Sequence, residues 1–598
     1  MCAATVVLFG ATGAGKTTTA QVLKEKYGWS CLDIDSSIEI EVGRSIAEII
    51  RVEGEQYFRA LEAKAIEDAL KQAFDVISIG AGAVMTASVQ ECIERSAALP
   101  VLLDIGAEAA AERVLQDQLN GGQVRPMVAG DVVAGLDESE ARQAAIRRIQ
   151  DLARVRAEAY KQTARIRLIT EFADAETIAG VVVALREVEK IGPQLLVSPQ
   201  QLGAHGTSSV WVCEAGSNAE VFAVADRLEG KKHEGVFAIA DSMIPDAILE
   251  KLIPIESAGK VLKVGSGEAL KQLGEVERLS TTLLDSGANR AWTLLAIGGG
   301  VIGDLAGVVA SLFQRGMDLV HVPTTLVAQV DSAIGGKTAV NLPAGKNQLG
   351  TFHPARAVVS NIGALESLPE REFRSGLAEV VKYATVFSED FFSYLEQVID
   401  KVLVKEPKVL FEIVGFCSLQ KQRCIHNDLE DRLNVRALLN FGHTYGHAIE
   451  KLSGYGKLLH GEAVAVGMIQ ALKVSAELAE GAAEVSGVQH QDLERIARLL
   501  QRCLLPVAIP DGLLPKASSR SLGSREGLVE GTATSGIEPG TRQSGLRPSL
   551  ADWSAALRTD KKRSGNEVNF VVLEKIGSAQ IKRIPLERLV QRLEEAAL

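Results

Sequence analysis

Aromatic side chains, paired cysteines and excess positive charge are all scarce in this chain of 598 residues. Aromatic residues make up only 5%, whereas hydrophobic residues reach 46% and glycine occurs 55 times. This balance is typical of a soluble globular protein built from Ala/Val/Leu-rich α/β layers. The net charge of −12 disfavours non-specific nucleic-acid binding, so any affinity for phosphate must come from local sites.

Signals for export or membrane insertion are also lacking. The seven cysteines form no CxxC pair, which is typical of reduced thiols in a cytosol. No apolar run reaches the length of about 18 residues that spans a bilayer. The apolar stretch Thr5–Phe9 leads into a glycine loop, so we interpret it as a core strand and not a signal peptide. We therefore expect a cytoplasmic protein with neither membrane nor nucleic-acid partners.

The length and the changes in sequence pattern predict several domains of the α/β class. Short apolar strands alternate with helical stretches over residues 1–185, which predicts a parallel sheet with helices on both faces. Residues 186–209 have the composition of a linker, and α/β alternation resumes over 210–365. Residues 366–598 are expected to be mostly helical, with a disordered low-complexity insertion near 515–548.

A phosphate-binding motif occupies Gly10–Thr17, where the sequence fits G-x-x-x-x-G-K-[ST] between a strand and a helix. Its backbone N–H groups and the helix N-terminus favour phosphate oxygens. Lys16 is expected on the β/γ-phosphates, and the Thr17 hydroxyl on Mg²⁺. The residues predicted to contact the nucleotide are Gly13, Ala14, Gly15, Lys16, Thr17 and Thr18.

Charged residues downstream indicate an acceptor with a hydroxyl and a carboxylate. Asp33 and Asp35 follow a short strand, so one carboxylate can order Mg²⁺ and the other can accept a proton. Arg59 and Glu62 lie one helical turn apart, which suits an arginine that binds a carboxylate but is equally compatible with a surface ion pair.

Residues 3–175 resemble shikimate kinase, because Gly80-Ala81-Gly82, Arg125-Pro126 and the Arg156–Tyr160 spacing also match that family. The resemblance implies that Asp35 is the catalytic carboxylate and that Asp33 and Thr17 lie near Mg²⁺. It places Arg125 on ATP, and Arg59, Arg156 and the Ala81 turn on shikimate. The family usually has glycine at the position of Ala81, where the backbone approaches the substrate. A methyl group there could crowd the substrate, or force a backbone shift if φ is positive, so we expect weaker shikimate binding.

A second glycine turn, Gly298–Gly300, joins a predicted strand to a helix and is a weak dinucleotide signal alone. Together with Ser266–Lys271, Pro323–Thr325 and Asp331–Thr338 it makes residues 235–475 and the C-terminal tail resemble 3-dehydroquinate synthase. The resemblance implies an NAD⁺ site at Ser266, Gly267, Glu268, Lys271, Gly300, Val301, Ile302, Gly303, Asp304, Thr324, Thr325, Asp331, Lys337 and Lys346.

Three histidines predict a metal site. His443 and His447 share one helix face at i and i+4, and His460 follows a glycine-containing loop, so spacing alone would pair His443 with His447. The resemblance instead implies Glu379, His443 and His460 as ligands of Zn²⁺ or another divalent metal such as Co²⁺. His447 then becomes a neighbour that contacts substrate or handles a proton.

Further roles come only from the resemblance to the synthase. It implies Lys337, Lys382, Lys421, Arg436 and Asn440 as catalytic residues, and Arg315, Asn347 and Lys562 as substrate contacts. Arg315 matches a residue donated across a dimer interface, so a homodimer through the synthase half is expected. One extra residue in Leu429–Val435 departs from the family pattern, and Asp431 and Asn434 are the nearest substitutes there.

The two resemblances imply a bifunctional shikimate-pathway enzyme of aromatic amino-acid biosynthesis. One half would phosphorylate shikimate with MgATP. The other would convert 3-deoxy-D-arabino-heptulosonate 7-phosphate to 3-dehydroquinate and phosphate with NAD⁺ and a metal. The alternatives are a gluconate-type kinase joined to another cyclase or polyol dehydrogenase, and an inactive scaffold. Because the two steps are not consecutive, we expect the fusion mainly to fix equal dosage.

Overall fold

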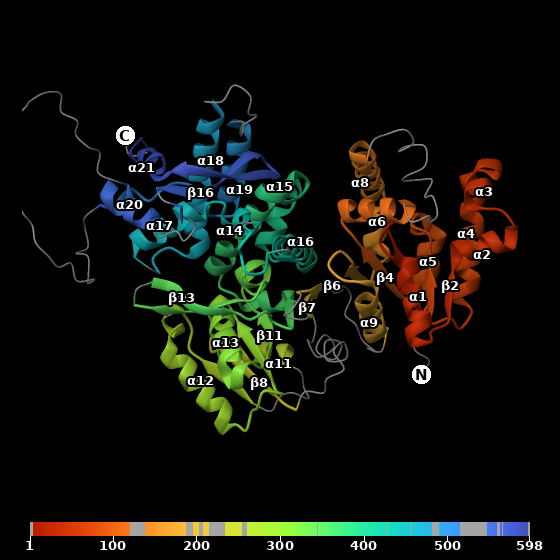
Figure 1. Cartoon of the computed structure of the whole chain (residues 1–598), viewed down its shortest axis with the longest axis horizontal. Coiled ribbons are helices and arrows are strands. Elements are labelled where there is room, and N and C mark those ends of the chain that lie inside the picture. Colours follow the sequence, from red (N-terminus) through yellow and green to blue (C-terminus); the bar gives the residue numbers. More distant parts are fainter. Residues whose placement is uncertain are drawn as a thin grey trace, which may run out of the picture. The chain divides into compact units, whose positions relative to one another are not determined.

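The structure, a computed structural model shown in Figure 1, describes residues 4–119, 138–186, 195–202, 207–213, 234–253, 260–343, 345–426, 428–433, 435–454, 456–480, 490–514, 547–558, 563–564 and 566–595. The chain forms two compact units. The first unit contains Met1–Leu368 and Lys405–Leu429, and the second contains Pro369–Val404 and Glu430–Leu598.

The N-terminal half of the first unit is a parallel sheet in the order β2-β3-β1-β4-β5. Its strands are β1 (Val6–Gly10), β2 (Cys31–Asp33), β3 (Val76–Ser78), β4 (Leu99–Asp104) and β5 (Ile166–Ile169). Its helices are α1 (Lys16–Tyr27), α2 (Ile34–Val42), α3 (Ile46–Glu53), α4 (Glu55–Leu70), η1 (Ala83–Met85), α5 (Ala87–Arg95), α6 (Ala107–Leu119), α8 (Glu138–Thr163) and α9 (Ala175–Arg186).

Strand β1 shows that this sheet is covered on both faces. Every side chain of the strand is buried. Val6 and Leu8 belong to one apolar cluster, while Val7 and Phe9 belong to another. Since successive side chains of a strand point to opposite faces, helices cover both sides of the sheet. The expected α/β architecture is therefore confirmed.

Part of the segment expected to be a linker is a β-hairpin of β6 (Leu195–Gln201) and β7 (Thr207–Cys213). Strand β6 pairs in parallel with β5 and antiparallel with β7. Strand β7 in turn pairs in parallel with β14 (Ala357–Asn361) of the next sheet region. The hairpin therefore joins both halves of the first unit into one twelve-stranded sheet, which can be followed through β6 and β7 in Figure 1.

The second half of the first unit continues the sheet in the order β14-β11-β10-β8-β9. Its strands are β8 (Val236–Asp241), β9 (Val261–Val264), β10 (Thr293–Gly298) and β11 (Asp318–Pro323), with a separate pair β12 (Lys337–Leu342) and β13 (Gly345–Phe352). Its helices are α11 (Asp246–Leu252), η4 (Glu268–Leu270), α12 (Leu273–Asp285), α13 (Gly300–Leu312), η5 (Phe313–Arg315), η6 (Ala328–Ser332), η7 (Ile362–Ser367) and α16 (Pro407–His426).

The second unit is mostly helical. It contains α14 (Glu370–Phe387), α15 (Glu389–Leu403), η8 (Val435–Asn440), α17 (His443–Ser453), α18 (His460–Glu480), α19 (His490–Arg502), η9 (Asp511–Leu513), α20 (Leu550–Leu557) and α21 (Leu586–Glu595). A three-stranded antiparallel sheet adds β15 (Arg563–Ser564), β16 (Glu567–Lys575) and β17 (Ser578–Pro585). Most of the insertion expected near 515–548 lies outside the described residues.

Helix α14 is the centre of the second unit, because every side chain from Leu377 to Val386 is buried. A helix buried on all faces normally carries apolar side chains only. Here Glu379 and Lys382 are buried as well, and they form an ion pair with each other. The fold therefore carries a charged pair into the interior of the helical unit.

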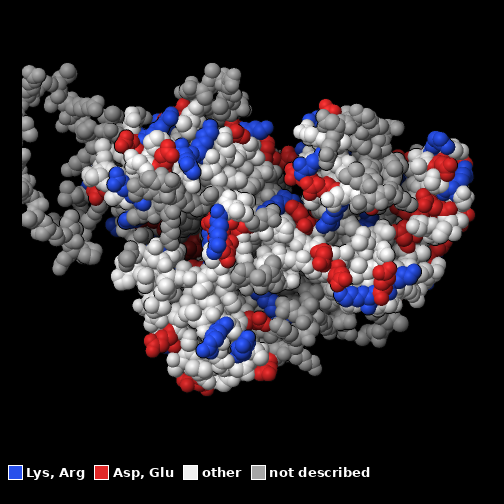
Figure 2. Space-filling model, viewed as in Figure 1, with Lys and Arg blue, Asp and Glu red and all other residues white. Residues whose placement is uncertain are grey.

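Charged side chains on the surface are mixed in sign. On the face seen in Figure 2, Lys and Arg alternate with Asp and Glu over the described residues. Among the helices that the structure describes, none has the length and apolar character needed to cross a membrane.

Close packing of α17 on α18 depends on Gly467. A Cβ atom at this position would lie 2.0 Å from the carbonyl oxygen of Gly442. We expect Gly467→Ala to destabilise the second unit by about 1–3 kcal/mol, because backbone atoms cannot move aside as a side chain can. Thermal unfolding should show a lower midpoint. Gly274→Ala is the control, because no heavy atom lies within 4 Å of its Cβ position; an equal loss in both variants would contradict the packing argument.

Candidate functional sites

The phosphate-binding loop lies where the sequence predicts it, between β1 and α1. Gly15 precedes α1 with a φ of 89°, a left-handed conformation that favours glycine. The Lys16 ammonium donates to the carbonyl oxygens of Gly10 and Ala11 at 2.9 and 3.2 Å. Lys16 therefore folds back over its own loop, where an incoming phosphate would compete for its protons.

Asp33 and Asp35 lie at the start of α2. Asp33 caps this helix, since its Oδ1 accepts from the Ser36 N–H at 3.1 Å. Asp35 lies in the first turn and faces the glycine turn after β3: a Cβ atom on Gly80 would be 3.1 Å from its Oδ1. The structure thus brings Asp35 to the turn that the sequence analysis assigned to substrate.

Arg59 and Glu62 form a partly buried pair and not a simple surface ion pair. Arg59 Nη1 donates to Glu62 Oε2 at 2.7 Å, and the Glu62 side chain is only 1% exposed. Burial raises the pKa of Glu62, and the guanidinium groups of Arg59 and Arg156 oppose that rise. Arg156 is itself buried, on α8. The charges of two guanidinium groups and of Asp35 therefore all act on Glu62, a residue that sequence reasoning did not assign to substrate.

The glycine turn differs from the expectation at Ala81. Ala81 has a negative φ, so its methyl group causes no backbone strain. Its carbonyl oxygen accepts from the Tyr160 hydroxyl at 2.7 Å. The close approach is instead at Gly82, where a Cβ atom would lie 2.5 Å from Arg59 Nη2. The strain anticipated at Ala81 is therefore absent.

The second glycine turn joins β10 to α13, as expected for a dinucleotide-binding turn. A small hollow here is lined by Gly298, Gly299, Gly300, Gly303, His321 and Ser332, among others. His321 is a residue that the sequence analysis missed: burial lowers its pKa to about 4, so its imidazole is neutral near pH 7. Its contact with the helix at Gly303 arises from strand pairing, which no local pattern reveals.

Lys271 connects two residues expected near the dinucleotide, Glu268 and Asp304, with Asn347, an expected substrate contact. The side chain is 4% exposed, and its ammonium donates to Asp304 Oδ2 at 2.6 Å and to Asn347 Oδ1 at 2.5 Å. Its distance to Glu268 Oε1 is 3.8 Å. Burial raises the pKa of Asp304, and the Lys271 charge opposes this rise.

Asp331 and Lys421 also meet, although 90 positions separate them. Lys421 on α16 donates to Asp331 Oδ1 on η6, and both side chains are largely buried.

The other residues expected at the NAD⁺ site lie at the ends of strands and helices. Val301, Ile302 and Gly303 lie in the first turns of α13, Ser266 and Gly267 precede η4, and Thr324 and Thr325 follow β11. Lys337 is the first residue of β12, and Lys346 is the second residue of β13.

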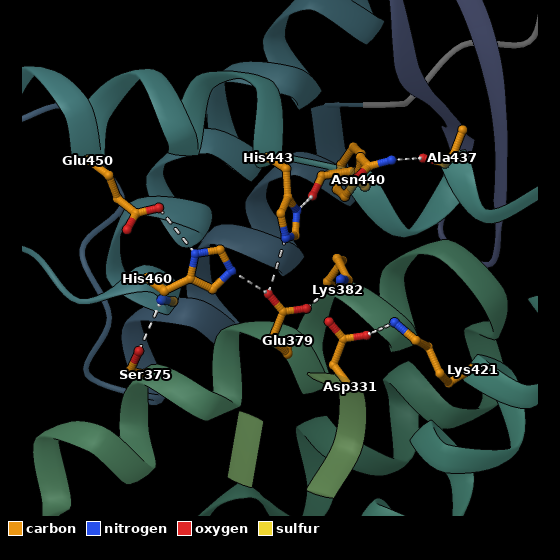
Figure 3. Close-up of polar contacts among 12 residues, drawn as sticks. Asp331, Ser375, Glu379, Lys382, Lys421, Ala437, Asn440, His443, Glu450 and His460 are labelled. Carbon is orange, nitrogen blue, oxygen red and sulfur yellow. Dashed lines mark hydrogen bonds and ion pairs between the residues drawn. The ribbon is translucent and has the colours of Figure 1, made fainter. Parts of the chain in front are cut away.

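The second unit brings together the three expected metal ligands (Figure 3). One ligand atom from each of Glu379, His443 and His460 lies within 4.8 Å of the others. The Nε2 atoms of His443 and His460 lie 3.5 and 3.4 Å from Glu379 Oε1. Two imidazole nitrogens and one carboxylate suit a catalytic Zn²⁺ site that keeps open positions.

The other nitrogen of each imidazole is held by a neighbour. His443 Nδ1 is 3.2 Å from the carbonyl oxygen of Phe441, and His460 Nδ1 is 3.2 Å from Glu450 Oε2. Such partners fix the ring orientation and tautomer of a metal-binding histidine. Glu450 escaped the sequence analysis, although it lies on α17 three positions after His447. His447 is exposed, with its ring centroid 5.3 Å from that of His443.

The electrostatic environment favours the metal-binding form of two of these three groups. Burial would raise the pKa of Glu379, but Lys382 and the two histidines hold it well below its usual range. Burial and the Lys382 charge lower the pKa of His443. The carboxylate is therefore ionised and the His443 imidazole neutral, which are the forms that bind metal. His460 differs: the Glu379 and Glu450 carboxylates outweigh the effect of burial and raise its pKa to about 10, so a metal ion must displace a proton from this imidazole.

Comparison with known proteins identifies both halves of the chain. A family model described as shikimate kinase matches residues 12–184. Models of the N-terminal and C-terminal domains of 3-dehydroquinate synthase match residues 261–375 and 376–522. The 3-dehydroquinate synthase of Acidithiobacillus ferrooxidans is 37% identical over 364 residues, which cover 60% of this chain and 88% of the relative. The chain belongs to the 3-dehydroquinate synthase family.

A shikimate kinase domain precedes the synthase, so the protein is a bifunctional shikimate-pathway enzyme. Among solved structures, a shikimate kinase from Acinetobacter baumannii in complex with shikimate is 25% identical, with a TM-score of 0.27 over 32% of this chain and 96% of that one. A 2-deoxy-scyllo-inosose synthase complexed with carbaglucose-6-phosphate, NAD⁺ and Co²⁺ is 25% identical, with a TM-score of 0.49 over 65% of this chain and 97% of that one.

Further expected residues of the synthase half lie on η5, on η8 and in the segment after α16. Arg315 follows Gln314 at the end of η5, and both have a positive φ, of 72° and 46°. Asn440 donates to the Ala437 carbonyl oxygen at 3.0 Å within η8, where Arg436 is also buried. Asp431, in the segment with an extra residue, has a φ of 58°. Arg125, Asn434 and Lys562 lie outside the described residues.

From the geometry of the glycine turn after β3, we predict different outcomes for substitutions at two neighbouring residues. Gly82→Ala should displace the Arg59 guanidinium and raise the KM for shikimate about tenfold or more, because a misplaced carboxylate partner weakens substrate binding. Ala81→Gly should change this KM little, and the KM for ATP should be unaffected in both. Steady-state kinetics with each substrate varied would test this, and a larger effect at Ala81 than at Gly82 would refute it.

The metal cluster predicts a role for Glu450. Glu450→Ala should lower Zn²⁺ affinity about 10- to 100-fold, because the His460 ring loses the carboxylate that orients it. Affinity is measured by competition with a chromophoric chelator, independently of turnover. Glu494→Ala is the matched control, since Glu494 lies 3.4 Å from the exposed His490. Equal affinities in the two variants would exclude this role.

Proposed function

We propose that the N-terminal half transfers the γ-phosphate of MgATP to the 3-hydroxyl of shikimate, and that the C-terminal half converts 3-deoxy-D-arabino-heptulosonate 7-phosphate to 3-dehydroquinate and phosphate. The observation that carries the proposal is the pairing of two complete sets of groups in a chain of these two families. One set is Lys16 together with Asp35, Arg59 and Arg156, whose charges act on Glu62, and the other is the Glu379–His443–His460 cluster.

In the kinase half, the roles follow from charge and position. Lys16 neutralises the phosphates on its loop, and Asp35 accepts the proton of the attacking hydroxyl. Arg59 and Arg156 bind the shikimate carboxylate, a group that gluconate-type acceptors would not present on a ring. Buried Glu62 keeps the Arg59 guanidinium in place. We assign Thr17 and Asp33 to Mg²⁺, and Gly13, Ala14, Gly15, Thr18 and Arg125 to ATP.

In the synthase half, Glu379, His443 and His460 would hold a divalent metal, Zn²⁺ or Co²⁺, and the β10–α13 turn would hold NAD⁺. When bound, these groups would polarise a substrate alcohol and take up and return a hydride. Because the hydride is returned, the overall reaction only eliminates phosphate and closes the carbocycle. The donor set supports this fit, since both histidines aim one nitrogen at Glu379 and anchor the other.

The remaining residues of the synthase half hold substrate. Lys382 lies beside Glu379 and keeps that carboxylate ionised, while His447 is placed to move protons. We assign Lys337, Lys346, Lys421, Arg436, Asn440, Asn347 and Lys562 to contacts with the phosphate, hydroxyl and carboxylate groups. Arg315 has a left-handed backbone conformation, and strained residues persist mainly where function requires them. We propose that Arg315 contacts a second subunit in a homodimer.

The six described cysteines form no disulfide bond with one another, which supports a reducing compartment such as the cytoplasm. We assign residues 1–185 to the kinase, 210–365 to the NAD-binding domain and 366–598 to the metal domain. Helix α16 is the exception within the last range, because it packs with the first unit.

Two variants of the full chain test the proposal. Lys16→Ala should abolish shikimate-dependent ATP consumption, since the loop loses the charge that binds phosphate, and should leave phosphate release from the heptulosonate phosphate intact. His443→Ala should do the reverse. Dialysis against EDTA should stop the synthase and spare the kinase once Mg²⁺ is restored. ATP consumption with gluconate but not shikimate, or full synthase activity after EDTA treatment, would overturn the corresponding half.

A further inference from the structure

Helix α16 of the synthase contacts the kinase domain on one side and the synthase site residues on the other. At 100° per residue, Glu412 and Arg423 share one helix face, and Lys421 lies about 200° around from Arg423. Lys421 donates to Asp331, and Ser418 Oγ lies 3.3 Å from the Gln329 carbonyl oxygen. The opposite face meets the kinase. The helix is therefore held between two domains of the same unit.

The contact with the kinase centres on Glu171. Arg423 Nε and Nη2 donate to the two carboxylate oxygens of Glu171 at 3.1 and 2.9 Å. A bidentate pair fixes both the position and the orientation of a guanidinium group. The side chains are 35% and 18% exposed, so water screens the pair only in part. Glu412, on the same face of α16, adds a contact to Lys161 at 3.2 Å.

The loop that carries Glu171 is itself anchored inside the kinase. Arg113 of α6 donates from Nη2 to the carbonyl oxygen of Thr170 at 2.5 Å. Gly106, which follows β4, leaves room for the pair: a Cβ atom there would lie 2.7 Å from Arg423 Nη2 and 3.1 Å from Glu171 Oε2. The kinase therefore holds Glu171 in a fixed position, and the missing side chain of Gly106 leaves space for the Arg423 guanidinium beside it.

Apolar packing between the kinase and α16 is incomplete. A cavity of about 180 Å³ lies at this junction, lined among others by Ile149 and Tyr160 of the kinase and by Phe411 and Glu412 of α16. Because side chains do not fill this space, the polar contacts carry more of the positioning. Strand β6 also holds α16: Gln422 Nε2 donates to the Ser198 carbonyl oxygen at 3.1 Å, and Gln200 Nε2 donates to the Gln422 carbonyl oxygen at 3.2 Å. The Glu171–Arg423 pair adds the adjacent contact, which comes from the kinase side.

We propose that the kinase domain positions α16 for the synthase, with Glu171 and Arg423 as positioning residues that hold Lys421 in place. The inference rests on the proposed role of Lys421 in the synthase reaction. The proposal differs from the expectation that the fusion mainly fixes equal dosage of the two activities. Here the kinase domain supports the structure of the synthase site, although the two sites bind different substrates. No intermediate passes between the two sites in this arrangement.

Two full-length variants break the pair by different means. Arg423→Ala removes the guanidinium group. Gly106→Ala keeps every charge but places a methyl group too close to Arg423 Nη2. Both should raise the synthase KM for its sugar phosphate and lower kcat/KM about fivefold, because Lys421 is less well placed. Amide hydrogen exchange within residues 407–426 should become faster in both. Arg95→Ala, which breaks an exposed 3.0 Å pair with Glu91 on α5, is the control and should change neither measurement.

Exchanging the charges in Glu171→Arg with Arg423→Glu should recover part of the lost kcat/KM, which a role in folding alone would not predict. The proposal fails if Arg423→Ala and Gly106→Ala leave both the exchange of α16 and the synthase constants unchanged. An inactive wild-type synthase would refute the proposed function instead. In that case faster exchange in the two variants would still support the positioning role, and unchanged exchange would refute it.

Discussion

The burial of the Glu379 carboxylate constrains the second unit more than any other single group. It lies in the part of α14 where every side chain is buried, and an unpaired charge would be strongly unfavourable there. Lys382 and the imidazoles of His443 and His460 supply the compensating partners, so α14, α17 and α18 must meet at this point. The same arrangement leaves two histidine nitrogens directed at one carboxylate, which is how a metal site is preformed.

A second constraint is the continuity of the sheet in the first unit. Strand β6 would be an edge strand of the synthase, and edge strands expose unpaired backbone groups that favour association. In this chain β5 of the kinase pairs with it, with Ile166 opposite Leu195. The fusion therefore covers one edge of each sheet with the other, and this explains why the intervening segment forms strands although its composition suggests a linker.

Local sequence predicted those site features that depend on neighbouring residues. The phosphate-binding loop, the Arg59–Glu62 pair and the i, i+4 histidines all follow from spacing along one element. The choice of His460 over His447 beside Glu379 needed the family resemblance, because it depends on how three helices pack. Glu450, His321 and the Lys421–Asp331 pair escaped a local reading, since each contacts a group on another element of the fold.

The sequence by itself predicted a phosphate-binding loop and a histidine metal site, because both are short motifs with strict local geometry, and its resemblance to two families indicated a kinase joined to a synthase. Only the tertiary structure decided the backbone conformation of Ala81, the groups that orient His443 and His460, and the contact of α16 with the kinase domain. The physical reason is that φ angles at a turn, hydrogen-bond partners and interdomain contacts are set by long-range packing. No periodicity or spacing within one segment records such packing.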